Sequence, residues 1–277
     1  MTFVSASARR FWTIALSLAI VGCANIRPPG ENETSASIAN ADVTPLTNAM
    51  AERDRALVSL QTSAVMEYSS GNDHVKARED IAVRRPASLR VEARSPFGIA
   101  LIVAAQDTRL QIFEPSKNTL LRGTADAATL ARFARIPMAP RDAVGLLMGI
   151  VPEAQNTSPP DGVTSEGDMT VLTYAEPDGG RRELGFKDAH LAMVRKRTAD
   201  GAVAFEIRYA DYHDIGGVMF AYKVDADFPL VATKVSFAYK RPIVNGKIAD
   251  STFKLTPNGA QLIDLGMARA SQDGRDG

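Results

Sequence analysis

The sequence predicts a mainly β protein of the α+β class, in which an antiparallel sheet packs against a few short helices. About a dozen segments between residues 62 and 241 alternate apolar and polar side chains, the pattern of strands with one buried and one wet face. Helical spacing of apolar residues stands out in residues 46–60 and 125–150. A composition of 45% hydrophobic and 23% charged residues over 277 positions is typical of a globular chain.

Residues 1–22 have the pattern of a secretory signal peptide. They contain no acidic residue, Arg9 and Arg10 form a basic region, and residues 11–22 form an apolar run. That run is too short to span a bilayer, which needs about 20 residues. It fits the apolar core of a signal peptide, which has roughly 7–15 residues.

Cys23 is the single cysteine, and it follows Ile20, Val21 and Gly22. These four residues resemble the bacterial lipobox, in which the thiol receives a diacylglyceryl group, the peptide is cut before the cysteine and the new amine is acylated. The resemblance implies a lipoprotein with palmitate among its attached chains, and two or more acyl chains anchor a protein stably. The alternatives are a buried cysteine after an ordinary signal peptide and an N-terminal membrane helix.

Ala24 follows the cysteine, whereas Asp at this position tends to retain lipoproteins in the inner membrane. We therefore expect the mature protein at the outer membrane, lipid-anchored on its periplasmic face. Removal of residues 1–22 takes away two of the 32 basic residues and none of the 32 acidic ones, which leaves the mature chain slightly acidic. This charge balance argues against a general nucleic-acid binder, which needs a basic surplus.

The mature chain divides into a lipidated cysteine with a flexible tether (residues 23–45), a folded domain (46–266) and a loose polar tail (267–277). The tether is rich in Pro, Asn, Ser and Glu and has no apolar periodicity. The domain begins with a helix over residues 46–60. The charges of residues 52–55 lie on one face of this helix, and its apolar residues lie near the other: Leu46, Met50, Leu57 and Leu60.

Strands dominate the rest of the domain, and turn signals separate several of them. In residues 203–209 the odd positions are apolar or aromatic and the even ones include Glu206 and Arg208. The predicted strands lie near residues 62–70, 76–85, 88–94, 99–105, 109–114, 118–122, 169–176, 182–187, 190–197, 202–210, 218–224 and 231–241.

Residues 125–150 interrupt the strands and predict two short helices. Leu130 and Phe133 recur at helical spacing before Pro137 and Pro140, and a second apolar series follows up to Ile150. Residues 153–168 then read as a polar loop. A sheet with one apolar face needs that face covered, and these helices together with the first one are the available cover.

This order of elements resembles the LolA/LolB-like superfamily of lipoprotein carriers and receptors. The lipobox is one matching feature, and a helix that leads into six strands is another. The remaining features are local motifs along the chain: Ser95-Pro96-Phe97-Gly98 between the third and fourth strands, Leu130 with Ile136-Pro137 and residues 146–152 in the helical insert, and the ending at 253–263.

The resemblance implies an incomplete antiparallel β-barrel of about eleven strands, wrapped around short helices that act as a lid. An apolar cavity between sheet and lid would receive acyl chains. Phe97 matches an exposed apolar residue of the receptor that helps deliver lipoproteins to the membrane; the alternative is a hairpin residue folded onto the core. The family's lid-locking arginine cannot be assigned to one residue. Inward alternation makes nine residues candidates for the cavity lining: Leu89, Val91, Ile112, Leu147, Ile150, Phe205, Ile207, Val235 and Phe237.

The sequence offers no catalytic or metal-binding pattern. His74, His190 and His213 lack metal-ligand spacing, and no nucleophile elbow, P-loop or dinucleotide motif is present. Glu79 and Asp80 are adjacent on a predicted strand and point to opposite faces. We therefore expect neither an enzyme nor a cofactor, and no metal.

The leading functional prediction is a monomeric, lipid-anchored outer-membrane lipoprotein that binds acyl chains or lipoproteins in an apolar half-barrel cavity. Its role would lie in lipoprotein localisation or a related task of envelope biogenesis. The alternative is a structural or interaction lipoprotein of the envelope, with a closed core and no ligand. The space between sheet and helices distinguishes the two, because ligand sites usually need several hundred Å³.

Overall fold

The computed structural model describes residues 36–37, 42–151 and 159–265, all of which belong to one compact unit that spans Thr34–Gly277. The predicted signal peptide, Cys23 and the predicted tail lie outside the described residues, as does most of the tether. Within the described ranges, no helix combines the length and the apolar character that a membrane crossing requires.

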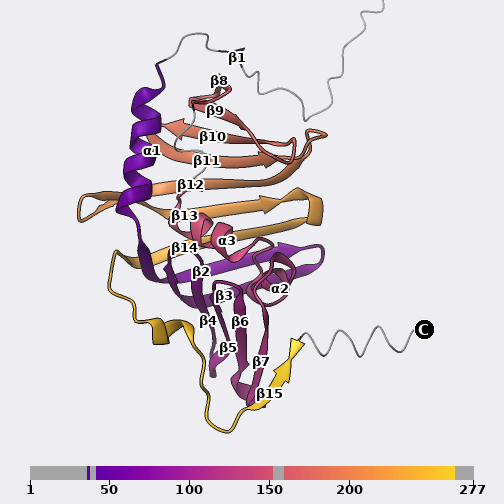
Figure 1. Ribbon diagram of the computed structural model, residues 1–277. Coiled ribbons are helices and arrows are strands. Elements are labelled where there is room, and N and C mark those ends of the chain that lie inside the picture. Colours follow the sequence, from indigo (N-terminus) through magenta and orange to yellow (C-terminus); the bar gives the residue numbers. More distant parts are fainter. Residues whose placement is uncertain (1–35, 38–41, 152–158, 266–277) are drawn as a thin grey trace, which may run out of the picture. The chain divides into compact units, whose positions relative to one another are not determined.

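The described strands form a single sheet of fifteen (Figure 1). Its first edge and first half follow the order β1 (Ala36–Ser37), β8 (Gly162–Glu166), β9 (Met169–Ala175), β10 (Arg181–Lys187), β11 (His190–Arg197), β12 (Val203–Ile215), β13 (Val218–Phe228) and β14 (Thr233–Val244). The second half continues with β2 (Ser59–Ser70), β3 (Asp73–Arg84), β4 (Ser88–Ser95), β5 (Gly98–Gln106), β6 (Arg109–Glu114), β7 (Thr119–Thr124) and β15 (Gln261–Asp264).

The topology consists of two antiparallel meanders, β8–β14 and β2–β7, joined by pairing of β14 with β2. Only the last described pair, β15 with β7, is parallel. The edge strands β1 and β15 do not pair with each other, so the sheet stays open. The predicted fold class, an incomplete antiparallel β-barrel, is therefore confirmed, and the sheet holds more strands than the eleven or so expected.

The additional strands arise where sequence patterns are weakest. β8 lies inside residues 153–168, which were predicted to be a loop, and it pairs with β9 through a tight turn at Gly167, whose φ is +59°. The last predicted strand begins at Thr233 and not at 231. Residues Pro229–Val231 form a 3-10 turn that leaves Leu230 and Val231 exposed.

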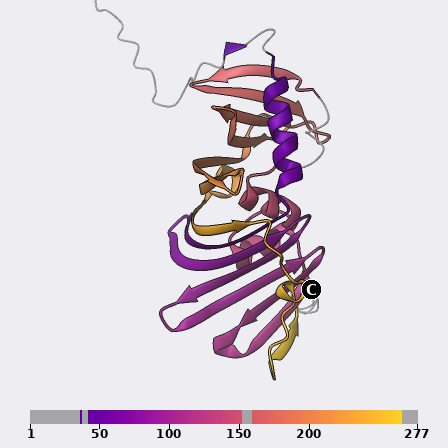
Figure 2. The ribbon, with the colours of Figure 1, turned by 90° about the vertical axis from the view of Figure 1, so that its left-hand side faces the viewer.

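The sheet curls around helices α2 (Ala127–Ala134) and α3 (Pro140–Met148), which lie on its concave side (Figures 1 and 2). Both helices match the predicted insert. Asp126 caps α2 by accepting the Thr129 amide at 2.8 Å, and Pro140 opens α3. The apolar faces of α2, α3 and the concave sheet share one core, which follows from the predicted period-2 alternation of the strands.

Helix α1 (Thr44–Ala56) ends four residues earlier than the predicted limit of 60. Leu57 adopts extended backbone angles and turns the chain into β2. Leu57 and Leu60 are buried as predicted, but from the helix end and the first strand and not from a helix face. Residues from Ser59 on form a strand and not a further helical turn, because Leu60 gains a cross-strand partner, Val83, in the sheet core.

A C-terminal strap, residues 246–260, crosses the convex face of the second meander. Arg84 and Arg90 donate from that face to the carbonyls of Ile248 and Thr252, each at 3.0 Å. The strap contains a 3-10 turn (Asp250–Phe253) that buries Phe253 against Ala82. The ending at 253–263 was expected to resemble a last strand, but only Gln261–Asp264 forms one.

The convex face of the first meander carries a buried ion-pair network centred on Arg195. Its guanidinium contacts Glu166 at 2.8 Å, Glu183 at 2.8 Å and Glu206 at 2.6 Å. Glu183, Arg195 and Glu206 are direct cross-strand neighbours on β10, β11 and β12. The alternation of charges along this row stabilises the pairing of the three strands.

Loss of Arg195 should therefore destabilise the domain strongly. We expect Arg195→Ala to lower the free energy of unfolding by roughly 3–5 kcal/mol, because buried carboxylates lose their cation. Arg208→Ala is the matched control: Arg208 also contacts Glu206 but is half exposed, so the expected loss is below about 1 kcal/mol. Urea denaturation followed by circular dichroism measures both, and equal losses would contradict the prediction.

Candidate functional site

Helix α3 ends inside the curled sheet, where its last carbonyl groups lack intrahelical partners. Gly149 ends the helix with a left-handed φ of +62°. Two tyrosines of the concave face cap the end: the Tyr239 hydroxyl donates to the Leu147 carbonyl at 2.8 Å, and the Tyr209 hydroxyl donates to the Leu146 carbonyl at 3.2 Å. Burial raises the pKa of both tyrosines well above its ordinary value, so both hydroxyls keep their protons.

Arg53 of α1 completes this cap from the other side. Its Nε donates to the Gly149 carbonyl at 2.7 Å, one Nη donates to the Met148 carbonyl at 3.1 Å, and the other donates to the Met219 carbonyl of β13. The cation meets the negative end of the α3 dipole. Arg53 thereby joins α1, α3 and β13, and we call these three hydrogen bonds the Arg53 latch.

The sequence pattern missed the Arg53 latch. Residues 52–55 were expected on the solvent face of the first helix, but Arg53 turns inward, and burial lowers its pKa from the ordinary value. Residues 52–55 are all charged, and nothing in the sequence distinguishes Arg53 from the other three. Only the register of α1 against α3 and β13 distinguishes it from its neighbours.

The nine predicted lining residues lie where the sheet meets the helices. Eight are buried in the shared core and Phe205 packs partly against it. Leu147 and Ile150 come from the end of α3, while the remaining seven come from β4, β6, β12 and β14. These side chains are packed together, and none of them lines a surface cleft of about 540, 330 or 420 Å³. Their role as a cavity lining stays a prediction for a form in which the helices have moved.

Glu79 is a charged residue in this apolar interior. It lies on the concave side of β3 between Ala64 of β2 and Ala93 of β4, and it is only 5% exposed. Burial raises the pKa of Glu79 to about 7. The prediction that Glu79 and Asp80 point to opposite faces is confirmed, because Asp80 lies on the convex side and pairs with Arg94 at 2.5 Å.

Phe97 lies at the tip of the β4–β5 hairpin and is fully exposed. Ser95 tightens the turn: its hydroxyl accepts the Phe97 amide at 3.2 Å and donates to the Gly98 carbonyl at 3.1 Å. The positive φ of Gly98, +118°, suits a residue without a Cβ. The structure therefore presents Phe97 to the surroundings and excludes the alternative that it folds back on the core.

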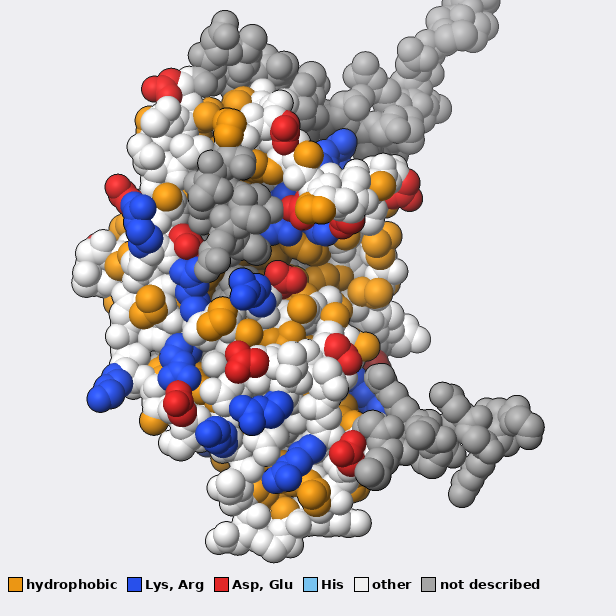
Figure 3. Space-filling model, in the orientation of Figure 1, with side chains coloured by type: hydrophobic (Ala, Val, Ile, Leu, Met, Phe, Trp, Pro, Cys, Tyr) orange, Lys and Arg blue, Asp and Glu red, His pale blue; other side chains and the backbone are white. Residues whose placement is uncertain are grey.

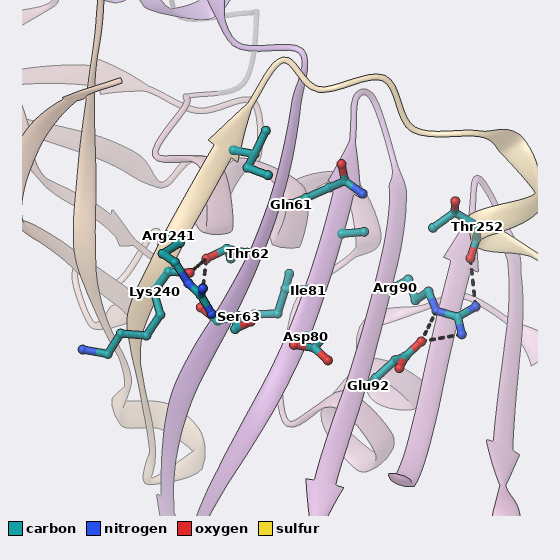
Figure 4. Close-up of a pocket in the computed structure, with 12 residues that line it drawn as sticks. Gln61, Thr62, Ser63, Asp80, Ile81, Arg90, Glu92, Lys240, Arg241 and Thr252 are labelled. Atoms are coloured by element: carbon teal, nitrogen blue, oxygen red, sulfur yellow. Dashed lines mark hydrogen bonds and ion pairs between the residues drawn. The ribbon is translucent and has the colours of Figure 1, made fainter. Parts of the chain in front are cut away.

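Two clefts on the described surface are polar. One, of about 540 Å³, lies on the convex face beside β2, β3, β4 and β14 (Figure 4). Arg90 spans it from Glu92, at 2.5 Å, to the carbonyl of Thr252 in the strap. Another cleft of about 330 Å³ lies between the strap and residues 106–123. The charged and amide side chains that line them, with the Arg90–Glu92 pair in the first and Arg109, Arg122 and Lys254 in the second, do not suit an acyl chain.

The third cleft, of about 420 Å³, is more apolar. It lies between α1 and the ends of β10–β13, and Arg53 lines it. In the space-filling view, hydrophobic side chains gather near the middle of the face around α3, with charged residues of both signs around them (Figure 3). Among the described residues, no three His, Cys, Asp or Glu side chains gather as a metal site requires.

A curled antiparallel sheet closed by short helices defines a recognisable class of folds, and comparison with solved structures identifies it. The chain has a LolA-like fold. No protein-family model matches the sequence, and no curated protein does.

Three solved structures carry the assignment. A LolA superfamily protein from Nitrosomonas europaea has a TM-score of 0.50 at 12% identity, over 76% of this chain and 97% of its own. A DUF1329 family protein from Desulfovibrio piger has a TM-score of 0.52 at 12% identity, with the same coverage of 76% and 97%. A domain from Vibrio parahaemolyticus, described as an outer membrane lipoprotein-sorting protein, has a TM-score of 0.51 at 9% identity over 75% and 95%.

Replacement of Glu79 tests the electrostatics of the interior. The folded-state pKa of about 7 lies above the ordinary 4.5, so Glu79 favours folding most below pH 4.5 and loses that contribution as the pH rises to 7. The stability of Glu79→Gln relative to the wild type should therefore rise by roughly 3 kcal/mol over this interval and then stay level.

Urea denaturation at a series of pH values measures this difference. Glu79→Ala is the matched control, because it also removes the titrating group and should show the same pH dependence with a different constant offset. A difference that does not change with pH would contradict the prediction.

Removal of one tyrosine hydroxyl tests the cap on α3. We expect Tyr239→Phe to lower the free energy of unfolding by about 1–3 kcal/mol, because the buried Leu147 carbonyl loses its donor. Tyr222→Phe is the matched control on β13, since its hydroxyl donates to none of the described residues, and its effect should stay within about 0.5 kcal/mol. Thermal unfolding compares the two, and equal shifts would show that the cap contributes nothing.

Proposed function

We propose that the protein is a lipid-anchored outer-membrane lipoprotein that binds acyl chains, or the acyl chains of lipoproteins, between its concave sheet and helices α2 and α3. One observation carries the proposal: the sheet curls around a large apolar interior that short helices cover, α2 and α3 on the concave side and α1 through Met50. The fold shared with a LolA superfamily protein and with a domain described as lipoprotein-sorting agrees with this role.

The proposed mechanism is transfer without catalysis. An acyl chain that leaves water gains about 0.8 kcal/mol per methylene, and the interior and a bilayer provide similar apolar surroundings. Displacement of α3 by the chain would break the two tyrosine hydrogen bonds and the Arg53 latch. The two tyrosine bonds contribute about 1 kcal/mol each, and the two bonds from the Arg53 guanidinium to the Met148 and Gly149 carbonyls about 1.5–3 kcal/mol each. At about 0.8 kcal/mol per methylene, roughly six to ten methylenes offset these four bonds.

Two features support a position at a membrane. The structure shortens the predicted tether, because β1 (Ala36–Ser37), which lies inside residues 23–45, pairs with β8. Cys23, if lipidated as its lipobox implies, would tether the domain through the roughly 12 residues before β1, whose r.m.s. span as a coil is roughly 20 Å. Phe97 exposes its whole ring at a hairpin tip, where it can enter a bilayer and hold the interior near the receiving membrane.

Lipid binding can be tested on the mature chain without its acylated cysteine, residues 24–277, purified from a periplasm without detergent. Mass spectrometry should detect co-purified acyl lipid, and a triacylated lipopeptide should displace a fluorescent fatty-acid probe. Absence of both signals from a folded protein would refute the proposal. It would favour the structural or interaction lipoprotein, which the close packing of the interior fits.

The membrane role of Phe97 has its own test. We expect Phe97→Glu to abolish insertion of the protein into phospholipid monolayers, because a carboxylate replaces a ring in the acyl region. Its stability should change by less than about 0.5 kcal/mol, since the side chain is fully exposed. Ile243→Glu is the matched control, at an exposed apolar residue near the other end of the strands. Equal loss of insertion in both variants would argue against a specific role.

A further inference from the structure

The cleft beside α1 borders the shared core through Met50, Phe186 and Leu191, but none of the nine predicted lining residues of the interior lines it. Its volume of about 420 Å³ lies within the range of small-molecule sites, roughly 300–1,000 Å³. One wall is α1, and the other wall is formed by β11, β12 and the β12–β13 turn. Its apolar lining includes Met50, Phe186, Leu191, Val218 and Met219.

Arg53 places a cation on the wall of this apolar cleft. A guanidinium has five N–H donors, and the three carbonyls of the Arg53 latch occupy three of them. No carboxylate among the described residues forms an ion pair with Arg53. Its charged group otherwise lies against aromatic rings, with the guanidinium carbon 5.9 Å from the centroids of both Tyr212 and Phe220.

This arrangement leaves a partly desolvated charge without a counter-ion. The α3 dipole supplies only about half an elementary negative charge, so the capping role of Arg53 does not fully neutralise it. A buried cation is stable when it meets an anion that also satisfies its free donors. The cleft therefore combines apolar walls with a cation that has no counter-ion among the described residues.

We infer that this cleft binds a single-chain anionic amphiphile, with the anionic head at Arg53 and the acyl chain along Met50, Leu191 and Met219. A carboxylate or a phosphate monoester would accept from the two free N–H groups. Other charged or titratable groups of the lining are few. Glu52 is exposed on α1, and His190 stacks on Tyr212 with their ring centroids 5.0 Å apart.

The inference deepens the proposed function and rests on it for the acyl nature of the ligand. The head group would accept from the two free N–H groups, and its full negative charge would weaken the attraction of Arg53 for the Met148 and Gly149 carbonyls. Occupation of the cleft would therefore weaken the Arg53 latch and favour departure of α3 from the interior. A neutral chain without an anionic head would lack this effect.

The test uses residues 24–277 and isothermal titration calorimetry at pH 8. Dodecanoate should bind at least about 10-fold more tightly than 1-dodecanol, which has the same chain and no charge, and butyrate should not bind measurably. Dodecyl phosphate should also bind more tightly than the alcohol, and the tighter of the two anions identifies the head group. Equal affinity for dodecanoate and 1-dodecanol would overturn the inference.

Variants of α1 separate the cleft from the latch, since substitution of Arg53 itself would also uncap α3. Ala49 lines the cleft and Ala51 does not, although both lie on α1 and are partly exposed. Ala49→Glu should weaken dodecanoate about 10-fold and leave 1-dodecanol within about 3-fold, because it adds a like charge near the head group. Ala51→Glu should change neither. An equal effect of both substitutions would overturn the inference.

The same variants distinguish failure of this inference from failure of the proposed function. Binding of the triacylated lipopeptide by the interior should be unchanged in Ala49→Glu. Lipopeptide binding without a preference for dodecanoate would refute the anionic cleft alone. Dodecanoate binding that depends on Ala49, without any lipopeptide binding, would refute the interior site and keep the cleft.

Discussion

The end of α3 inside the curled sheet is the constraint on which the arrangement of the helices depends. A helix that terminates in an apolar interior exposes carbonyl groups that water cannot reach, and each unpaired one costs about 1–3 kcal/mol. Tyr209 and Tyr239 from the sheet and Arg53 from α1 supply the donors. These three residues come from β12, β14 and α1, so one helix end ties together both the first meander and the N-terminal helix.

In the proposed function, these polar contacts are the ones that an entering acyl chain would have to break. Apolar packing holds α2 and α3 in place, but directional contacts are concentrated at one end of α3. Glu79 adds a carboxyl group in the concave face beneath them, flanked by two alanines and poorly solvated. The satisfied hydrogen bonds of the cap fix the end of α3, whereas burial disfavours the charged form of Glu79.

Sequence patterns predicted most of this fold because alternation and helical spacing are local. Ile207 and Phe237 were assigned to the inner face from their alternation alone, and both are buried there. Local patterns failed where neighbours in space decide the structure. β8 is polar and depends on pairing with β9, and the strap depends on donors such as Arg84 and Gln111 on the convex face. Arg53 could not be singled out, because its partners are about a hundred residues away or more.

The sequence by itself determined the class of fold, the inward faces of the strands and the position of Phe97 in a hairpin turn, because each follows from side-chain alternation and turn chemistry within a few residues. Its lipobox pattern at Cys23 remains the basis for the predicted membrane anchor. Only the tertiary structure decided that Phe97 is exposed, that Arg53 faces inward and that a cleft opens beside α1. Exposure, burial and concavity depend on which distant segments pack against a residue, and no local pattern contains that information.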